Sequence, residues 1–455
     1  MSIISKLTLL ATAGSAKDLD YYWFDVYGTT QGSPITDIAV DSQGATVEYY
    51  KNLDSIGGFL TKREPDGSII WQVKVLQNYG QNFSPENARI DFDENRDIMF
   101  AFTGEGNNGS IAMTLHSGTD GSLMDGPVYI NPQLGSGGID INPRYVNKLS
   151  NGNYLVTCDS QSHTFNSTLD NIVTTGRNVP QATNIGTDSS GNTVMYRTSA
   201  GGTLNGQFYF WLIGFNPTTG TKVYEKRIQH QGLNWQINKY LTDGTNTYLV
   251  GNFPASGVNS GIVVRLTAEG STLGTVVPSI SWGRYYGGVT IMDAVLLSTG
   301  GIVTAGVGSA YTQSAAVNSI NIVSYSTTGT WNYLHSFGPK SGGGNPVITS
   351  RDMTIDENDN IYIPCHSAGV GNKVAMLKIP AEGAVTQTLA AADTGLSNDL
   401  GYLSSWTNQP TPISGGLTAN TTVNTVATKT GVLGVFGAIN VTTSTLTHTQ
   451  VDVTT

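Results

Sequence analysis

The sequence has little charge, almost no cysteine and no long apolar run. Charged residues make up 12% of the 455 residues, about half the usual share, and the net charge is −10. No run of Lys or Arg occurs, and binding a phosphate backbone needs clustered cations, so nucleic acid is not expected as a partner. No apolar stretch reaches the length of a membrane span. We therefore expect a soluble protein with a neutral polar surface.

A repeat fills most of the chain. Two kinds of tight turn alternate along residues 36–390, with seven of each kind. The first kind joins two apolar strands, as at Ser42-Gln43-Gly44, and the second is typified by Pro65-Asp66-Gly67. Such hairpins favour Asp, Asn and Gly because these residues tolerate positive φ. The other first turns lie at 94–96, 151–152, 189–191, 243–244, 299–300 and 359–360, and the other second turns at 119–121, 168–170, 218–220, 268–270, 327–329 and 381–383.

The repeat unit has the content of one β-propeller blade. Successive first turns are between 39 residues (Gly152 to Gly191) and 59 residues (Gly300 to Asp359) apart. A unit of this length with two hairpins holds four strands. A single blade cannot bury both of its faces, so the units must pack radially. The sequence thus predicts an all-β chain with one seven-bladed propeller over residues 19–390.

The two ends of the chain have other patterns. In residues 1–18, Ile4, Leu7, Leu10 and Ala11 have helical spacing, which predicts a short amphipathic helix or an anchoring arm. A signal peptide cleaved after Ala16 is the alternative, although its apolar run would be near the lower length limit. A frayed terminus is a second alternative.

Ring closure is expected to use the aromatic segment Tyr21-Tyr22-Trp23-Phe24, which resembles the outer strands of the units. This segment should pair with residues 374–379 of the last unit. Residues 384–390 compete for the same place, and the sequence leaves both options open.

Residues 391–455 are Thr-rich and carry almost no charge. Thr alternates with other residues along 441–451, and Val432, Leu433, Val435 and Phe436 add apolar positions. Alternation with β-branched residues predicts strands, here a small three-stranded sheet. Open sheet edges pair readily with another chain, so we interpret this region as an attachment or oligomerisation element. The alternative is a sheet that caps the propeller itself.

Metal and cofactor sites have only weak support. Asp91, Asp93, Asn95 and Asp97 match positions one, three, five and seven of a calcium loop, but Arg96 and Phe102 stand where Gly and an acid are required. Turns favour Asp and Asn in any case. The six His are dispersed, and the close pairs Cys158/His163 and Cys365/His366 lack the further ligands that zinc needs. We expect no obligatory metal and no cofactor, with calcium at residues 91–97 as the leading candidate and at residues 356–360 as a weaker one.

The two cysteines end equivalent strands of the third and seventh units, so we expect free thiols. No nucleophile elbow, phosphate-binding loop or zinc-protease motif occurs. A propeller glycosidase would use paired acids near the axis, for which Asp37, Asp293 and Asp352 are candidates. Because an Asp before a hairpin is more often a backbone cap, we expect no enzyme activity.

The tryptophans fall into two groups. Trp23, Trp71, Trp282 and Trp331 recur in the outer strands, where aromatic residues pack blade against blade. Trp211, Trp235 and Trp406 lie outside that pattern. These three are therefore the candidates for stacking on a sugar or contacting a partner protein.

Two resemblances suggest a setting. The pattern Ile-Ala-Val-Asp-Ser-x-Gly at residues 38–44, with Pro-Asp-Gly-x-x-x-Trp at 65–71, resembles seven-bladed propeller repeats of the SBBP and NHL type. Residues 1–16 are similar to the starts of virion structural proteins of tailed phages of marine bacteria, including cyanophages.

The second resemblance implies an architectural virion protein of the phage tail, in its fibre or nozzle complex, or else a capsid decoration. It would form a homo-oligomer or ring with other virion proteins and could bind a host-surface glycan. The alternatives are an exported, extracellular bacterial propeller that binds glycans, and a propeller glycan hydrolase or lyase.

Overall fold

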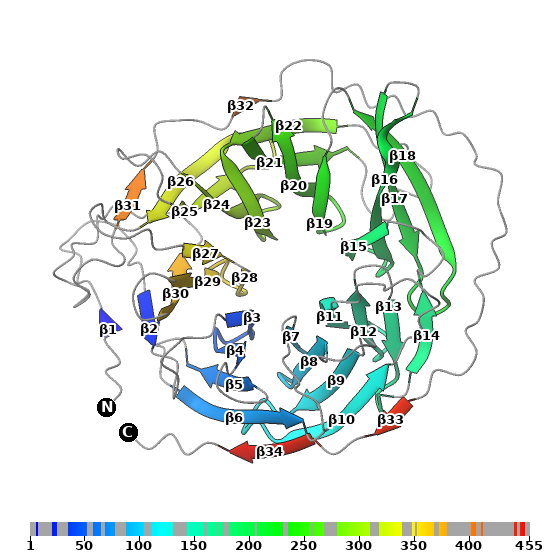
Figure 1. Cartoon of the computed structure of the whole chain (residues 1–455), viewed down its shortest axis with the longest axis vertical. Helices are drawn as coiled ribbons and strands as arrows, with labels where there is room; N and C mark the ends of the chain where they lie inside the picture. Colours follow the sequence, from blue (N-terminus) through cyan, green and yellow to red (C-terminus); the bar gives the residue numbers. More distant parts are fainter. Residues whose placement is uncertain are drawn as a thin grey trace.

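Seven antiparallel sheets are arranged around one axis in the computed structural model (Figure 1). The structure describes residues 6–7, 21–24, 35–51, 58–64, 69–77, 88–103, 111–130, 143–158, 162–169, 171–175, 182–204, 207–230, 235–255, 258–267, 280–309, 318–338, 348–350, 353–367, 373–379, 402–405, 411–412, 441–443 and 446–450. The seven-bladed propeller predicted from the repeat is confirmed. No helix long and apolar enough to cross a membrane occurs within these ranges.

Each blade is a meander whose first strand lies nearest the axis and whose fourth strand lies toward the circumference (Figure 1). Blade 1 comprises β3 (Ile35–Val40), β4 (Thr46–Lys51), β5 (Gly58–Arg63) and β6 (Ile69–Gln77); blade 2 comprises β7 (Ala88–Phe92), β8 (Ile98–Thr103), β9 (Ile111–His116) and β10 (Leu123–Ile130); blade 3 comprises β11 (Pro143–Lys148), β12 (Tyr154–Cys158), β13 (Ser162–Phe165) and β14 (Asn171–Thr175); blade 4 comprises β15 (Ala182–Thr187), β16 (Thr193–Leu204), β17 (Gln207–Phe215) and β18 (Lys222–His230).

The remaining blades follow the same order. Blade 5 comprises β19 (Gln236–Thr242), β20 (Thr247–Ala255), β21 (Val258–Leu266) and β22 (Ile280–Gly287); blade 6 comprises β23 (Val289–Leu296), β24 (Ile302–Ser309), β25 (Asn318–Tyr325) and β26 (Trp331–Gly338); blade 7 comprises the divided first strand β27 (Ile348–Ser350) and β28 (Thr354–Ile355), then β29 (Ile361–Ser367) and β30 (Lys373–Ile379).

The N-terminal segment closes the ring. Strand β2 (Tyr21–Phe24) pairs with β30 as the outer strand of blade 7, with Tyr21 opposite Leu377 and Phe24 opposite Val374. This confirms the expected closure, while the competing residues 384–390 lie outside the described residues. Lys6–Leu7 forms the extended strand β1, which pairs with β2, so the helical alternative is wrong at these two positions. The anchoring-arm alternative for residues 1–18 stays a prediction, and the other residues of this range lie outside the described residues.

The Thr-rich C-terminal region adds single strands to the propeller's own blades. β31 (Tyr402–Ser405) pairs with β26, β32 (Thr411–Pro412) with β22, β33 (Val441–Thr443) with β10 and β34 (Leu446–Gln450) with β6. The separate three-stranded sheet that we predicted here is therefore wrong for the described strands. Their partners are the outer strands of the propeller's blades. This arrangement is closer to the alternative of a sheet that caps the propeller itself.

The turn chemistry explains why the chain meanders at these points. All seven first turns place a residue at positive φ, namely Gly44, Arg96, Gly152, Gly191, Gly244, Gly300 and Asp359. The described second turns do so at Gly121, Leu169, Gly220 and Gly329. In four of the first turns an Asp three residues earlier accepts backbone N–H groups that lie within the loop, and these are Asp41, Asp93, Asp188 and Asp356.

The hydrophobic core lies between blades. Apolar side chains of blades 1 and 2 form one cluster around Trp71 and Phe100, and those of blades 5 and 6 form another around Tyr248 and Trp282. Burying the faces of neighbouring blades against each other is what makes a four-stranded unit stable.

Candidate functional sites

The acidic turn proposed for calcium is used by the fold. Asp93 Oδ1 accepts the backbone N–H groups of Asn95 and Asp97, each at 2.9 Å, and Asp93 Oδ2 lies 3.1 Å from the ammonium of Lys148 in blade 3. Asn95 is exposed. The carboxylate that should anchor a calcium ion therefore already caps the turn and pairs with the next blade.

The other two candidate ligands are also engaged. Asp97 Oδ1 accepts the N–H of Gly118 at 3.0 Å, and Asp91 Oδ1 accepts the N–H of Phe92 at 2.8 Å. Burial raises the pKa of Asp91 to about 7, against the opposing effect of that backbone hydrogen bond. Within the described ranges, no group of three or more His, Cys, Asp or Glu side chains is placed to hold a metal ion.

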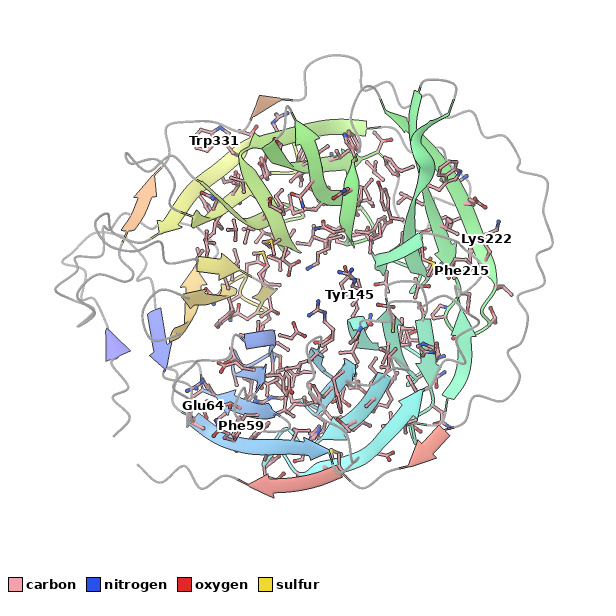
Figure 2. The ribbon with its side chains drawn as sticks, viewed as in Figure 1. Phe59, Glu64, Tyr145, Phe215, Lys222 and Trp331 are labelled. Carbon is pink, nitrogen blue, oxygen red and sulfur yellow. The ribbon has the colours of Figure 1, made fainter. Side chains whose placement is uncertain are left out.

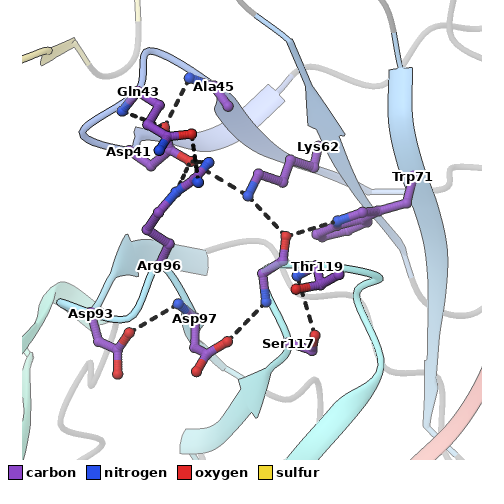
Figure 3. A network of polar contacts seen from close by, with 11 residues as sticks. Asp41, Gln43, Ala45, Lys62, Trp71, Asp93, Arg96, Asp97, Ser117 and Thr119 are labelled. Carbon is purple, nitrogen blue, oxygen red and sulfur yellow. Dashed lines mark hydrogen bonds and ion pairs between the residues drawn. The ribbon is translucent and has the colours of Figure 1, made fainter.

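A network of charged groups joins blades 1 and 2 beside this turn (Figure 3). Asp41, whose side chain is fully buried, accepts the Nε–H of Arg96 at 2.8 Å and lies 3.4 Å from the ammonium of Lys62. Lys62 and Trp71 of blade 1 both donate to the carbonyl oxygen of Gly118 in blade 2, at 2.9 and 3.3 Å. Two side chains of blade 1 thus donate hydrogen bonds to the second turn of blade 2.

The charges in this network stabilise one another. Burial alone would raise the pKa of Asp41, but hydrogen bonds from Arg96 and from the turn's backbone lower it below its usual value. Burial lowers the pKa of Lys62, and the charge of Asp41 opposes that effect. A Cβ atom on Gly118 would lie 1.9 Å from the carbonyl oxygen of Arg96, so only glycine fits this approach.

A second set of polar contacts runs around the axis between the innermost strands. Strands β3, β11, β15, β19 and β23 each carry a bulge, and the residues that follow the bulges are Asp37, Tyr145, Gly186, Lys239 and Asp293. A bulge changes the direction of the side chains beside it. Each of these five residues contacts the next blade.

The contacts of these five residues follow one direction around the ring. Asp37 Oδ2 accepts the N–H of Ile90 at 2.6 Å, and Asp293 Oδ2 accepts that of Met353 at 2.8 Å. Lys239 forms an ion pair with Asp293. A Cβ atom on Gly186 would lie 2.4 Å from the carbonyl oxygen of Tyr240. The bulged residues therefore join each of these blades to the next.

Tyr145 lies at the inner end of blade 3 (Figure 2). Its hydroxyl donates to the carbonyl of Ile185 at 3.1 Å, and the carbonyl of Asn238 is 3.4 Å from the same oxygen. Burial raises the pKa of Tyr145 to about 12. Sequence reasoning missed Arg89, Tyr145 and Lys239 here, because the bulges before the last two are seen only in the strand registers of the structure.

The acids considered for catalysis hold backbone groups and cations. Arg89 lies 3.8 Å from Asp37, in addition to the N–H of Ile90. Asp293 also accepts the N–H of Ala294 at 2.8 Å. Asp352 lies outside the described residues. The interpretation of Asp37 and Asp293 as acceptors for backbone groups agrees with this geometry. The N–H groups of Ile90 and Met353 belong to the next blade rather than to the acid's own turn.

The tryptophan candidates separate in the structure. Trp235 is only 1% exposed and packs between blades 4 and 5, with its ring centroid 5.9 Å from that of Phe210, so it has no surface for a sugar or a partner. Trp211 is half-buried and packs on blade 4 beside Met195 and Phe215, so its partner role stays a prediction. Trp406 lies outside the described residues.

The recurrent tryptophans act as expected in two interfaces. Trp71 lies against the second turn of blade 2, where a Cβ atom on Gly121 would be 2.8 Å from its ring. Trp282 lies in the same way against Gly329 in blade 6 and donates its indole N–H to the carbonyl of Thr327 at 2.8 Å. Blade-to-blade packing is confirmed for these two residues.

The cysteine and histidine pairs are not brought into one site. Cys158 is a buried thiol on β12 of blade 3, while Cys365 belongs to β29 of blade 7. His163 is buried on β13, and burial lowers its pKa to about 4. His116 lies between the hydroxyl of Thr114 and the carbonyl of Gly121, at 2.9 and 3.2 Å, so it supports the second turn of its own blade.

The comparisons with known proteins found similarity to solved structures alone. No family model and no curated protein matches the sequence. Among solved structures, the chain is similar to the Dos1 propeller, with 10% identity, a TM-score of 0.45 and coverage of 80% of this chain and 87% of that one. It is also similar to a protein of unknown function from Bacteroides caccae, with 13% identity, a TM-score of 0.33 and coverage of 52% and 80%.

A third similar structure is the extracellular domain of the putative one component system BT4673 from B. thetaiotaomicron. The identity is 12% and the TM-score 0.41, over 78% of this chain and 39% of that one. Propellers host many unrelated activities, so similarity at this level leaves function to the chemistry of the residues.

Proposed function

We propose that the chain is a structural protein of a tailed-phage virion, built into the tail as part of its fibre or nozzle complex, without enzyme activity. The setting is supported by residues 1–16, which are similar to the starts of virion structural proteins. The role is supported by the use of buried charge, since Asp37, Asp41 and Asp293 all bind groups of the next blade. Acids committed to holding blades together suit a scaffold better than a catalyst.

The partners of such a scaffold would be other virion proteins and further copies of the chain. Adsorption to a host-surface glycan is a second role that the same position in the tail would allow. Among the tryptophans outside the repeat, Trp211 is the candidate for that contact, because it is half-buried whereas Trp235 is buried. A Trp211→Ala phage should then adsorb to host cells more slowly, while its particles assemble normally.

Mass spectrometry of purified virions tests the proposal directly. The chain should be recovered at a fixed number of copies per particle, and labelled antibodies should bind the tail in electron micrographs. Recovery only from culture medium, cleaved after Ala16, would contradict the proposal and favour the exported glycan-binding propeller. Hydrolysis of a host polysaccharide by the purified protein, abolished by Asp37→Asn, would contradict the non-enzymatic role.

A further inference from the structure

The innermost strands carry exposed side chains at their bulges. In a regular strand, side chains point alternately to the two faces of the sheet, and in a blade both faces pack against neighbouring blades. A bulge inserts one extra residue into this alternation. The extra residues are Arg144 in blade 3, Asn238 in blade 5 and Met292 in blade 6. All three are exposed, on strands that surround the axis (Figure 1).

Contacts between blades bring the polar members of this set together. Arg89 of blade 2 donates its Nε–H to the carbonyl oxygen of Arg144 at 2.9 Å. Tyr145 follows Arg144 in the chain, and its hydroxyl lies 3.4 Å from the carbonyl oxygen of Asn238. Blades 2, 3 and 5 therefore contribute to one continuous polar region beside the axis.

In this region the cations are more exposed than the acids. The side chains of Asp37 and Asp293 are 7% and 6% exposed, whereas those of their partners Arg89 and Lys239 are 21% and 17% exposed. Both carboxylates also accept a backbone N–H of the next blade. Arg144 adds a third, fully exposed cation. Positive charge therefore lies closer to the solvent than negative charge does.

Tyr145 senses this positive charge. Burial raises its pKa to about 12, and the charge of Asp293 acts in the same direction, whereas the charges of Lys239, Arg89 and Arg144 oppose them. Cations from three blades thus act on one hydroxyl beside the axis. This region contrasts with the net charge of −10 on the whole chain, and it attracts anions.

We propose that the exposed residues at these bulges bind an anionic sugar unit, with Arg144 in contact with its charged group. A guanidinium can pair with a carboxylate or a phosphate through two parallel N–H donors. The amide of Asn238 can donate to and accept from sugar hydroxyls, and Met292 offers an adaptable apolar surface. The site deepens the adsorption role proposed above, and the choice of a sugar over other anions rests on that role.

Calorimetric titration of the full-length protein with trigalacturonate tests the site. The methyl ester of the same oligosaccharide is the matched neutral ligand, and it should bind at least tenfold more weakly than the acid. Arg144→Gln removes a charge at an exposed position and should raise the Kd for the acid about tenfold or more. Lys222→Gln removes an exposed cation from the outer strand of blade 4 and should change the Kd less than twofold.

Glucose 6-phosphate tests the identity of the charged group. Binding of trigalacturonate alone would identify a carboxylated sugar, and binding of glucose 6-phosphate alone a phosphorylated one. Either result supports the site if Arg144→Gln weakens the binding and Lys222→Gln does not.

Three outcomes would overturn the site. The first is that neither anionic probe binds to wild type. The second is equal affinity for the acid and its ester, a comparison that needs no variant to fold. The third is the same Kd in Arg144→Gln and Lys222→Gln, which would reduce the effect to nonspecific attraction. Absence of the chain from virions would refute the proposed function and leave these titrations unaffected.

The converse result is equally distinct. If the chain is recovered from virions and neither anionic probe binds to it, the proposed virion role stands and the axial site is wrong.

Discussion

The interfaces between blades 1 and 2 and between blades 5 and 6 share one geometry and differ in charge. In both, an outer-strand Trp donates to a carbonyl in the next blade's second turn, from Trp71 to Gly118 and from Trp282 to Thr327. The first interface surrounds this contact with Asp41, Lys62 and Arg96 (Figure 3). In the second, the hydroxyl of Tyr248 donates to the carbonyl of Gly300 at 2.7 Å. Both interfaces therefore use the aromatic contact at their outer turns, and the blade 1–2 interface adds buried charges around it. Closer to the axis, the blade 5–6 interface has an ion pair of its own between Lys239 and Asp293.

The same contrast exists within the blades. In blade 1, Glu48 and Arg63 form a buried ion pair, with Nε and Oε2 3.1 Å apart. The strand register places Leu249 and Leu266 at the corresponding positions of blade 5, counted from Thr46 opposite Arg63 and Thr247 opposite Leu266. Both leucines are buried in one apolar cluster. The fold thus accepts either an ion pair or two apolar side chains at this place.

The largest expected effect comes from breaking the ion pair of blade 1. Glu48→Leu leaves Arg63 buried without its carboxylate, and we expect a loss of about 3–5 kcal/mol in the free energy of unfolding. The double variant Glu48→Leu/Arg63→Leu copies blade 5 and should be close to wild type or more stable. Urea denaturation of the three proteins measures the difference. A double variant as unstable as the single one would show that blade 1 depends on the charge itself.

The Asp41 network should be the next most sensitive. Asp41→Ala leaves Lys62 buried beside Arg96 and removes the acceptor for two backbone N–H groups of the first turn. We expect a loss of about 2–4 kcal/mol, below the Glu48 value because Arg96 is 35% exposed and can be hydrated.

The matched control for Asp41 is Ser298→Ala in blade 6. The hydroxyl of Ser298 donates to Asp359 of blade 7 at 2.6 Å in an exposed, singly charged contact between first turns. It should cost less than about 1 kcal/mol. Equal losses in the two variants would contradict the view that charge burial distinguishes the two sides of the ring.

Substituting Trp71 and Trp282 tests the comparison of the two interfaces further, because the carbonyls that accept their indole N–H groups differ in their other donors. Trp71→Phe removes one donor to the Gly118 carbonyl, which keeps the ammonium of Lys62, whereas Trp282→Phe removes the indole donor from the Thr327 carbonyl. Thr327 is half-buried, and losing its indole donor should cost more than losing one of the two donors to Gly118. We expect about 1 kcal/mol for Trp71→Phe and about 2 kcal/mol for Trp282→Phe in urea denaturation. The reverse order would mean that Lys62 does not support the turn.

Much of the fold could be predicted because its signals are local. The positive φ at Gly44 or Gly300 depends on the turn's own residues, and the aromatic pattern of Tyr21–Phe24 identified the closing strand. The partners of the C-terminal strands could not be predicted, since a strand with Thr on both faces carries little information on register.

The candidate sites were less predictable for a similar reason. Asp93 was singled out for its oxygen atoms, and its role as a turn cap follows from the same local sequence. The contacts of Tyr145 and Lys239 depend on a bulge and on a strand of another blade, which no local pattern indicates. Trp235 is a candidate for binding because it lies outside the outer-strand repeat. Its side chain instead packs between blades 4 and 5.

The smallest expected effect is the pH dependence that Asp91 of blade 2 gives to the stability. Because the folded-state pKa of Asp91 is about 7, the folded protein retains a proton that the unfolded chain releases near pH 4. Asp91 therefore contributes stability that is lost as pH rises from about 4 to about 7.

Asp91→Asn should remove this dependence and keep the acceptor for the N–H of Phe92. Relative to wild type, the variant should gain about 1 kcal/mol between pH 4 and pH 8, less than the full pKa shift implies because Asp91 is only half-buried. His163, whose low pKa makes stability fall as pH drops from about 6.5 to 4, is common to both proteins and cancels in the difference. Urea denaturation across this range gives the measurement, with Trp282→Phe as a control that should show no change in its difference from wild type. A constant difference between Asp91→Asn and wild type would contradict a raised pKa for Asp91 in the folded protein.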